Sequence, residues 1–194
     1  GYRTISTNPC GEIPLCPYDS CRLIAMNLYS YVENPFTPEA KFNMKLFKNH
    51  AAKALRLNDD LIDLEMEKID AIISKIDKDP EDEDVKRNER ELWEKIKAKS
   101  LGGRRTGLGI TAEGDMLAAL GLRYGSEEAI KVGVLVQKTL ALSAYASSVQ
   151  LAQERGPFPI FDANRELRNP MIERIRQEDE ELYQRMVKAG RRNI

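Results

Sequence analysis

The residue pattern predicts a mostly α-helical chain with a few short strands, and three observations support this fold class. Apolar residues recur at helical spacing through two long stretches, 37–78 and 126–154. Prolines and glycines gather outside these stretches, at 9–17 and 102–109, where they favour turns and extended segments. The 194 residues are enough for one ordinary domain with its own core.

The first part of the chain is expected to be extended, and a helical hairpin should follow it. Residues 1–36 hold several prolines and only short apolar runs. Residues 37–39 (Thr-Pro-Glu) have the composition of a helix start, with a hydroxyl cap, a proline in the first turn and an acid at the positive end of the helix dipole. Residues 79–81 (Asp-Pro-Glu) repeat this chemistry. We therefore expect one long helix that ends by Lys78 and a second, very polar helix, which together project from the body.

The rest of the chain should combine one strand with several helices. Gly102-Gly103 breaks the second helix, Ser126 offers an N-terminal cap, and Asn169-Pro170 offers a cap followed by a proline. The expected elements are a strand over 105–112, a short helix over 115–120, a long apolar helix over 126–154, a turn over 156–159 and a helical region over 169–190.

Composition excludes several classes of partner. The formal net charge is −1, so no bulk field recruits nucleic acid or an anionic membrane. No run of about 18 apolar residues offers a transmembrane helix, and no signal peptide is visible. We therefore expect a cytoplasmic protein that binds neither nucleic acid nor a membrane.

The three cysteines all lie between residues 10 and 21. An odd number within one short segment does not resemble the disulfide framework of a secreted protein. A zinc site would need Cys-x2-Cys pairs and further ligands, whereas these cysteines are spaced differently and His50 is the single histidine. We therefore expect no metal site, and a redox role in a reducing compartment.

Residues 8–12 (Asn-Pro-Cys-Gly-Glu) are the most informative part of the chain. The proline and glycine beside the cysteine predict a tight loop. Cys10 can act as a nucleophile or a radical carrier, Glu12 can act as a general base, and the Asn8 amide can hold a hydroxyl or an oxyanion. A free cysteine taken by itself is more often a small buried hydrophobe, so this motif alone leaves both interpretations open.

Longer motifs make the signal specific. Three early segments resemble the active-site finger loop of ribonucleotide reductases: residues 8–15 (Asn-Pro-Cys-Gly-Glu-Ile-Pro-Leu), 19–23 (Asp-Ser-Cys-Arg-Leu) and 26–28 (Met-Asn-Leu). Three later segments resemble the same family in the same order: residues 103–109 (Gly-Arg-Arg-Thr-Gly-Leu-Gly), 154–158 (Glu-Arg-Gly-Pro-Phe) and 190–194 (Gly-Arg-Arg-Asn-Ile). The Asn-Pro-Cys-Gly-Glu form is similar to the adenosylcobalamin-dependent class II branch.

This resemblance implies an α/β fold, a reaction and a cofactor. The chain would be a helix-rich part of the ten-stranded α/β barrel of ribonucleotide reductases. The parent enzyme would reduce ribonucleotides to 2'-deoxyribonucleotides, and adenosylcobalamin would generate the radical. Cys10 would carry the thiyl radical, Glu12 would take the proton of the ribose 3'-hydroxyl, and Asn8 would hold the ribose hydroxyls.

The resemblance also implies further site residues and partners. Thr7 and Gly11 would lie at the substrate together with Asn8. Cys21 would supply reducing equivalents and end in a disulfide with a cysteine on an earlier strand, which this chain lacks. The expected partners are the ribonucleotide, a thioredoxin-like reductant, the remainder of the reductase chain and a second copy in a homodimer. Cys16 has no role in the resemblance, and we interpret it as structural.

Because family members are several times longer, we expect this chain to be a fragment. We divide its partial catalytic barrel domain, residues 1–194, into three parts. These are a finger loop and strand (1–36), a long helix and polar helical hairpin (37–100), and a short strand with helices (101–194).

Other interpretations stay open at this point. The chain could be a non-catalytic helical interaction module, or a thiol oxidoreductase that uses Cys16 and Cys21, although it lacks a Cys-x-x-Cys motif. Residues 107–114 superficially suggest a dinucleotide loop, but their third glycine is misplaced and close strand packing is the expected alternative. The arginine pairs at 104–105 and 191–192 could bind phosphate, although structural ion pairs are more common at such positions.

Overall fold

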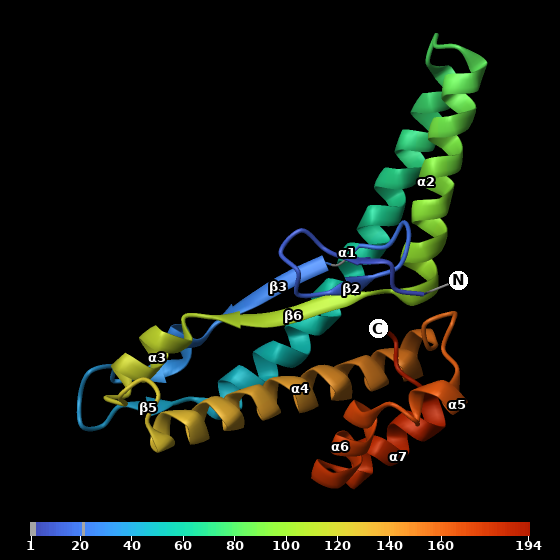
Figure 1. Cartoon of the computed structure of the whole chain (residues 1–194). Helices are drawn as coiled ribbons and strands as arrows, with labels where there is room; N and C mark the ends of the chain where they lie inside the picture. The colour runs from blue at the N-terminus through green and yellow to red at the C-terminus, as the bar shows by residue number, and fades with distance from the viewer. Residues whose placement is uncertain (1–2, 21) are drawn as a thin grey trace.

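A parallel pair of strands, β3 (Arg22–Asn27) and β6 (Thr106–Thr111), lies at the centre of the fold (Figure 1). The structure is a computed structural model, and it describes residues 3–20 and 22–194. The strands pair in register from Arg22 opposite Thr106 to Asn27 opposite Thr111. Helix α1 (Met44–Lys78) packs against both strands and against α4 (Glu127–Arg155).

The two faces of the strand pair differ in what covers them. Met26 of β3 and Leu108 of β6 belong to the main apolar cluster, which the helices complete. On the opposite face Leu23 is 59% exposed, and Ala25 and Gly109 are also exposed. Because side chains alternate along a strand, one face is core and the other is an open surface with small side chains. Residues 106–111 of this glycine-rich segment form the regular strand β6, in place of a dinucleotide loop. A Cβ added at Gly109 would meet no atom within 4 Å, so the expected close packing is not found at that glycine.

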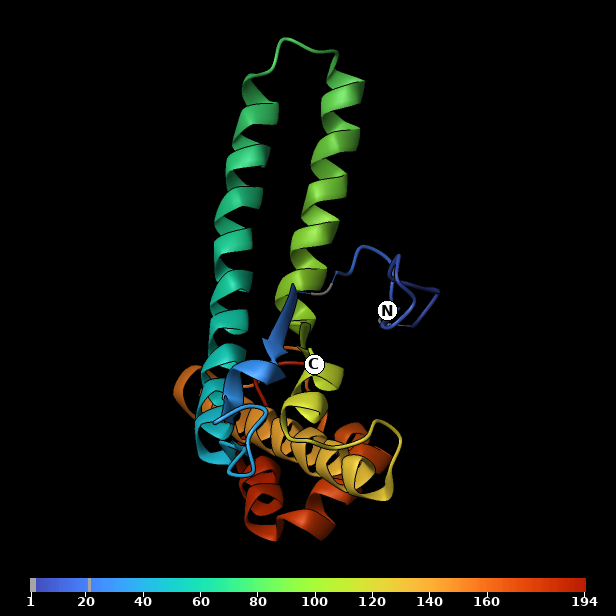
Figure 2. The same ribbon diagram turned by 90° about the vertical axis from the view of Figure 1, so that its left-hand side faces the viewer.

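Helix α1 and α2 (Glu83–Gly103) form the expected hairpin, which projects from the body in Figures 1 and 2. The predicted helix starts at residues 37 and 79 are both wrong. Asp79 follows the end of α1, and α2 begins at Glu83 with Asp82 as its cap. Helix α1 begins at Met44, where the Oδ1 atom of Asn43 accepts a 2.9 Å hydrogen bond from the Leu46 N–H. The Thr37 hydroxyl instead donates to the carbonyl oxygen of Asn34 and closes a turn.

The residues before α1 are held by aromatic packing. A short 3-10 helix, η1 (Leu28–Tyr31), leads into β4 (Val32–Glu33), which pairs antiparallel with β5 (Lys41–Phe42). The Phe47 ring lies 5.1 Å from the Tyr31 ring and 5.4 Å from the Phe42 ring, measured between centroids. This apolar packing favours a strand at 41–42 over an earlier helix, which local capping chemistry does not reveal.

The later elements follow the predicted order, with one helical region divided in two. Helix α3 (Glu113–Ala119) precedes α4, whose N-terminus is capped by Ser126 as predicted. The region 169–190 holds α6 (Pro170–Glu178) and α7 (Glu180–Ala189), because the Asp179 side chain caps α7 by accepting from the Leu182 N–H. A short helix, α5 (Ala163–Glu166), was not predicted.

The strands of the described residues form three separate two-stranded sheets, and they do not close a barrel. The third sheet pairs β1 (Ser6–Thr7) with β2 (Pro14–Leu15). The Ile194 carbonyl oxygen accepts from the Thr106 N–H, so the last residues lie beside β6. The fold of the described residues is therefore helix-rich α/β, with six strands in place of the expected ten-stranded barrel. Among the described helices, none combines the length and apolar character that a membrane crossing needs.

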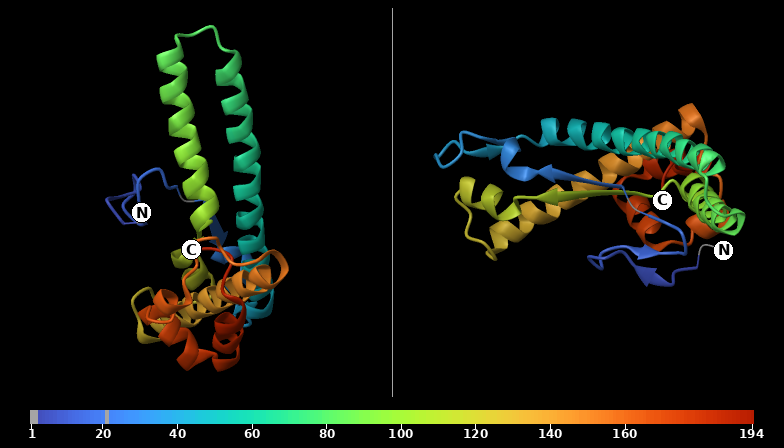
Figure 3. Two further views of the ribbon diagram at one scale, coloured as in Figure 1. Left: turned by 90° about the vertical axis from the view of Figure 1, so that its right-hand side faces the viewer. Right: turned by 90° about the horizontal axis from the view of Figure 1, so that it is seen from above.

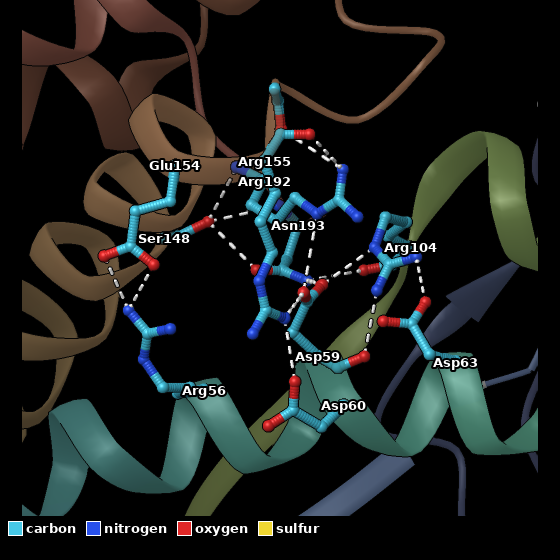
Figure 4. A network of polar contacts seen from close by, with 11 residues as sticks. Arg56, Asp59, Asp60, Asp63, Arg104, Ser148, Glu154, Arg155, Arg192 and Asn193 are labelled. Atoms are coloured by element: carbon cyan, nitrogen blue, oxygen red, sulfur yellow. Dashed lines mark hydrogen bonds and ion pairs between the residues drawn. The ribbon is translucent and has the colours of Figure 1, made fainter.

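A buried carboxylate joins the main elements at one point (Figure 4). Asp59 of α1 is fully buried. Its Oδ1 atom accepts from Arg104 Nε at 2.7 Å and from Asn193 Nδ2 at 2.8 Å, and its Oδ2 atom lies 3.0 Å from Arg155 Nη1 and 3.4 Å from Arg192 Nε. One side chain thus connects α1, the start of β6, the end of α4 and the last residues.

The same contacts set the charge state of this carboxyl. Burial by itself would raise the pKa of Asp59, but the hydrogen bond and charge of Arg104, together with Asn193 and Arg192, hold that pKa below its usual range. A carboxyl whose pKa is lowered by folding stabilises the fold above its unfolded pKa, and this contribution is lost as the pH falls through the folded pKa.

We predict that Asp59→Asn lowers the free energy of unfolding by about 3–5 kcal/mol, because it removes the buried negative charge that Arg104, Arg155 and Arg192 share. The adjacent Asp60→Asn is the matched control, since Asp60 is half exposed and its ion pair is with Arg155. Its cost should stay below about 1 kcal/mol. Thermal unfolding between pH 7 and 3 measures both. The Asp59→Asn deficit should be complete above about pH 5 and shrink below about pH 4, and a deficit that grows on acidification would contradict the assignment.

Candidate active site

The chemistry-bearing residues lie at the tip of a small hairpin. Ser6 pairs with Leu15 and Thr7 with Pro14, which leaves residues 8–13 as the connecting loop. In Figures 2 and 3 this hairpin lies on the side of β3 and β6 that faces away from α1. The loop is therefore on the side of the open strand face.

Asn8 closes this loop with three hydrogen bonds. Its N–H donates to the Ile13 carbonyl oxygen at 3.1 Å, its carbonyl oxygen accepts from the Gly11 N–H at 2.9 Å, and its Oδ1 atom accepts from the Ile13 N–H at 2.9 Å. Within the described part of the chain its Nδ2 group makes no hydrogen bond, so this is the end of the side chain that can donate to a ligand.

The sulfur and the carboxylate of the motif both face solvent. Cys10 and Glu12 are exposed, and Cys10 is a free thiol. Between them Gly11 has a φ angle of +83°, where residues with a Cβ are strained. Thr7 is exposed at the end of β1. The structure thus places Asn8, Cys10, Gly11 and Glu12 in one tight loop, as the sequence predicts, with Thr7 at its start in β1.

Cys21 lies outside the described residues, so its place in the site stays a prediction. The next residue, Arg22, begins β3 and is firmly held. Its Nε atom donates to Glu65 of α1 at 2.6 Å, and its Nη2 atom donates to Ser100 of α2 at 2.7 Å. The base of the helical hairpin therefore fixes the strand that follows the site loop.

Cys16 is buried and behaves as a structural residue. Its Sγ atom donates to Asp19 Oδ2 at 3.4 Å. Burial raises the pKa of the Cys16 thiol, and the Asp19 carboxylate raises that pKa further. A buried, protonated thiol is a poor nucleophile, which counts against a thiol oxidoreductase that uses Cys16.

Sequence reasoning missed Asp19 as a residue that organises the site. The Asp-Ser-Cys segment contained it, but no spacing rule pointed to its partner, Arg105, which donates from Nε to Asp19 Oδ2 at 2.8 Å from a position 86 residues away. Such a contact depends on the pairing of β3 with β6, which the local pattern does not specify.

The arginine pairs make structural ion pairs, as the commoner interpretation predicts. Arg105 binds Asp19 and Arg191 binds Glu166, with Nε to oxygen distances of 2.8 and 2.7 Å. The carboxylates of Asp59, Asp60 and Asp63 also lie close enough together to suggest a cation site. They are already neutralised by the arginines of Figure 4, so we interpret this cluster as an ion-pair network.

The structure is that of an α/β protein with an exposed cysteine on a loop that also holds a carboxylate and an amide. The chain belongs to the ribonucleotide reductase family: the model of the ribonucleotide reductase barrel domain matches residues 2–194.

Two relatives are vitamin B12-dependent ribonucleoside-diphosphate reductases. The chain is 32% identical to the one from Mycobacterium tuberculosis over 163 residues, which is 84% of this chain and 19% of the relative. It is also 32% identical to the one from Thermoplasma acidophilum over 156 residues, or 80% of this chain and 17% of the relative. The chain thus spans less than a fifth of the length of either.

We predict that Asn8→Ala loosens the site loop, because the Ile13 N–H loses its side-chain acceptor. Hydrogen exchange at the Ile13 amide should accelerate by about five- to tenfold, which corresponds to one lost hydrogen bond of about 1 kcal/mol. Asn8→Asp keeps the acceptor oxygen and should leave the exchange rate close to that of the wild type. Equal exchange in Asn8→Ala and the wild type would show that the loop does not depend on this bond.

Proposed function

We propose that this chain is the part of a ribonucleotide reductase that carries the thiyl radical site. The observation that supports the proposal is the exposed Cys10, which shares one loop with Asn8 and Glu12 in a chain of the ribonucleotide reductase family. The parent enzyme would convert ribonucleotides to 2'-deoxyribonucleotides, and ribonucleoside diphosphates are the substrate class that the names of the two relatives suggest.

Three side chains would divide the work at the ribose. The Cys10 thiyl radical abstracts the 3'-hydrogen, since S–H and activated C–H bonds are of similar strength. Glu12 accepts the proton of the 3'-hydroxyl, a contribution of roughly 10²–10⁴-fold. Asn8 donates from Nδ2 to a ribose hydroxyl, because its Oδ1 atom is engaged by Ile13. Thr7 and Gly11 line the same loop and would contact the substrate.

The electrons for reduction would come from Cys21. It would form a disulfide with a cysteine elsewhere in the parent chain, and a thioredoxin-like protein would then reduce that disulfide. Such a cycle needs a reducing compartment, so we place the parent in the cytoplasm. We also propose that the parent is a homodimer, as the family resemblance implies.

Adenosylcobalamin is the cofactor that we propose. When bound, it supplies a radical by homolysis of its cobalt–carbon bond. The cavities that the described residues line are small and open for such a large group: one beside Tyr124 and Ile130 measures about 460 Å³, and one between Leu108 and Tyr145 about 290 Å³. The residues present therefore do not fit the cofactor itself. We assign its binding to other parts of the parent, and to this chain only the exposed thiol of Cys10.

We further propose that the β3–β6 pair is part of a ten-stranded barrel in the parent, with residues 1–194 as a partial catalytic barrel domain. Support comes from the parallel pairing, the helices on one face and the backbone hydrogen bond of Ile194 to the edge of β6. On this proposal the isolated chain has no reductase activity, because its strand edges and substrate site are incomplete.

We predict that Cys10→Ser abolishes reduction in the full-length parent and leaves its circular dichroism unchanged, because a hydroxyl cannot carry the radical at accessible energy. Deoxyribonucleotide formation is measured with adenosylcobalamin and a dithiol reductant. Cys16→Ser is the control: its hydroxyl can still donate to Asp19, so turnover should persist. A Cys10→Ser rate within about tenfold of the wild type, which is less than even a general base contributes, would refute the thiyl assignment.

We predict that Glu12→Gln keeps radical formation at Cys10 but slows product formation by about 10²–10⁴-fold, because the amide cannot accept the 3'-hydroxyl proton. Electron paramagnetic resonance measures the first step and product analysis the second. Glu39→Gln, which removes a carboxylate far from the loop, should leave both unchanged. If product forms at the wild-type rate across pH, Glu12 is not the base.

A further inference from the structure

The hairpin that carries Cys10 has little attachment of its own to the body. Within the described residues, the hydrogen bonds of residues 3–15 all remain inside this hairpin. The hydrogen bonds that connect this part of the chain to the body are therefore made by the segment that follows, residues 16–20. This segment forms a turn in which the Asp19 N–H donates to the Cys16 carbonyl oxygen at 3.2 Å.

The side-chain contacts of this turn meet at the buried carboxylate of Asp19. Its Oδ1 atom accepts from the Ser20 N–H at 2.9 Å, while its Oδ2 atom accepts from Cys16 Sγ at 3.4 Å and from Arg105 Nε at 2.8 Å. The Asp19 side chain is 3% exposed and that of Arg105 is 17% exposed. A buried ion pair of this kind holds its two segments in one geometry, because separating the charges is costly.

Arg105 is a rigid partner for this contact. It stands between Arg104, which the buried Asp59 holds, and Thr106, which begins β6. Its carbonyl oxygen also accepts from Arg22 Nη1 at 3.4 Å, at the start of β3. The turn also contacts α2, where Lys95 Nζ lies 5.8 Å from the centroid of the Tyr18 ring. Both side chains are more exposed than Asp19 and Arg105, so this cation–π contact is weaker than the ion pair.

We propose that Asp19 and Arg105 form a latch that positions the hairpin, and with it Cys10, against the open face of β3 and β6. Asp19 is then a positioning residue, which acts on the reaction through Cys10. This inference rests on the proposed function for its effect on catalysis. The same contact holds the Cys16 thiol buried beside the Asp19 carboxylate. Cys16 is therefore kept out of the redox chemistry that we propose for Cys10 and Cys21.

The test uses the full-length parent with Asp19→Asn, which keeps the size of the side chain and removes its charge. A misplaced radical site slows the chemical step, so kcat should fall by about 10–100-fold while KM for the nucleotide stays within about threefold. Alkylation of Cys16 by iodoacetamide, localised by mass spectrometry in the tryptic peptide 4–22, should accelerate by about tenfold as the thiol becomes accessible.

Two further variants separate positioning from general stability. Glu166→Gln breaks a comparably buried pair with Arg191, at 2.7 Å, away from the loop; it should leave kcat and Cys16 alkylation near wild-type values. Arg105→Lys keeps the positive charge and should retain more activity than Arg105→Gln. If Asp19→Asn does not fold, the comparison of these two variants tests the proposal instead.

The outcomes are distinct. A lowered kcat with steady KM and exposed Cys16, absent from Glu166→Gln, supports the latch. Unchanged kcat and unchanged alkylation in Asp19→Asn overturn it, and so does an equal loss in Glu166→Gln at equal melting temperature. If the wild-type parent reduces no nucleotide, the proposed function fails, and the alkylation rates of the same variants still decide whether Asp19 holds the turn.

Discussion

The buried carboxylate of Asp59 is the contact on which the arrangement of this chain depends. A fully buried charge is tolerated only when it is paired and hydrogen-bonded, and here the partners come from three other parts of the sequence. Because Arg155 ends α4, Arg104 precedes β6 and Asn193 stands in the last residues, the pairing fixes where α4 ends, where β6 begins and where the last residues run. Apolar packing alone would allow these elements to slide.

A short series of contacts connects the candidate site to Asp59 and sets its position in the fold. Arg104 is held by Asp59, and the next residue, Arg105, reaches Asp19 in the turn below the site hairpin. Arg22, at the start of β3, is held by Glu65 of the same helix as Asp59. Two polar routes thus lead from α1 to the base of the segment that carries Cys10. The first passes through Arg104 and Arg105 to Asp19, and the second goes directly to Arg22. The loop itself is closed by Asn8 and needs no other support for its internal shape.

Several helix ends and the site loop could be predicted from the sequence, because neighbouring residues determine them. The caps at Ser126 and Asn169 and the glycines near 103 predicted helix ends correctly, because those groups act within one turn of the chain. The loop at 8–12 was predictable for the same reason. The start of α1 was not, since the packing of Phe42 against Tyr31 and Phe47 outweighs the capping residues at 37–39. The partners of Asp19 and Asp59 depend on which strands pair, and one sequence does not contain that information in any local pattern.

The projecting arm formed by α1 and α2 has a consequence for how such a protein can vary in length. Its contacts with the body reach Glu65 on α1 and Lys95 on α2, where Lys95 Nζ lies over the Tyr18 ring. At this level the two helices are also joined by cross-pairs such as Asp70 with Lys97. Seven residues make nearly two helical turns, about 10 Å of rise. Removing or adding seven in each helix beyond these pairs would shift the tip while every residue at the base keeps its facing partner. The arm can therefore change its reach over evolutionary time without any change at the thiol loop.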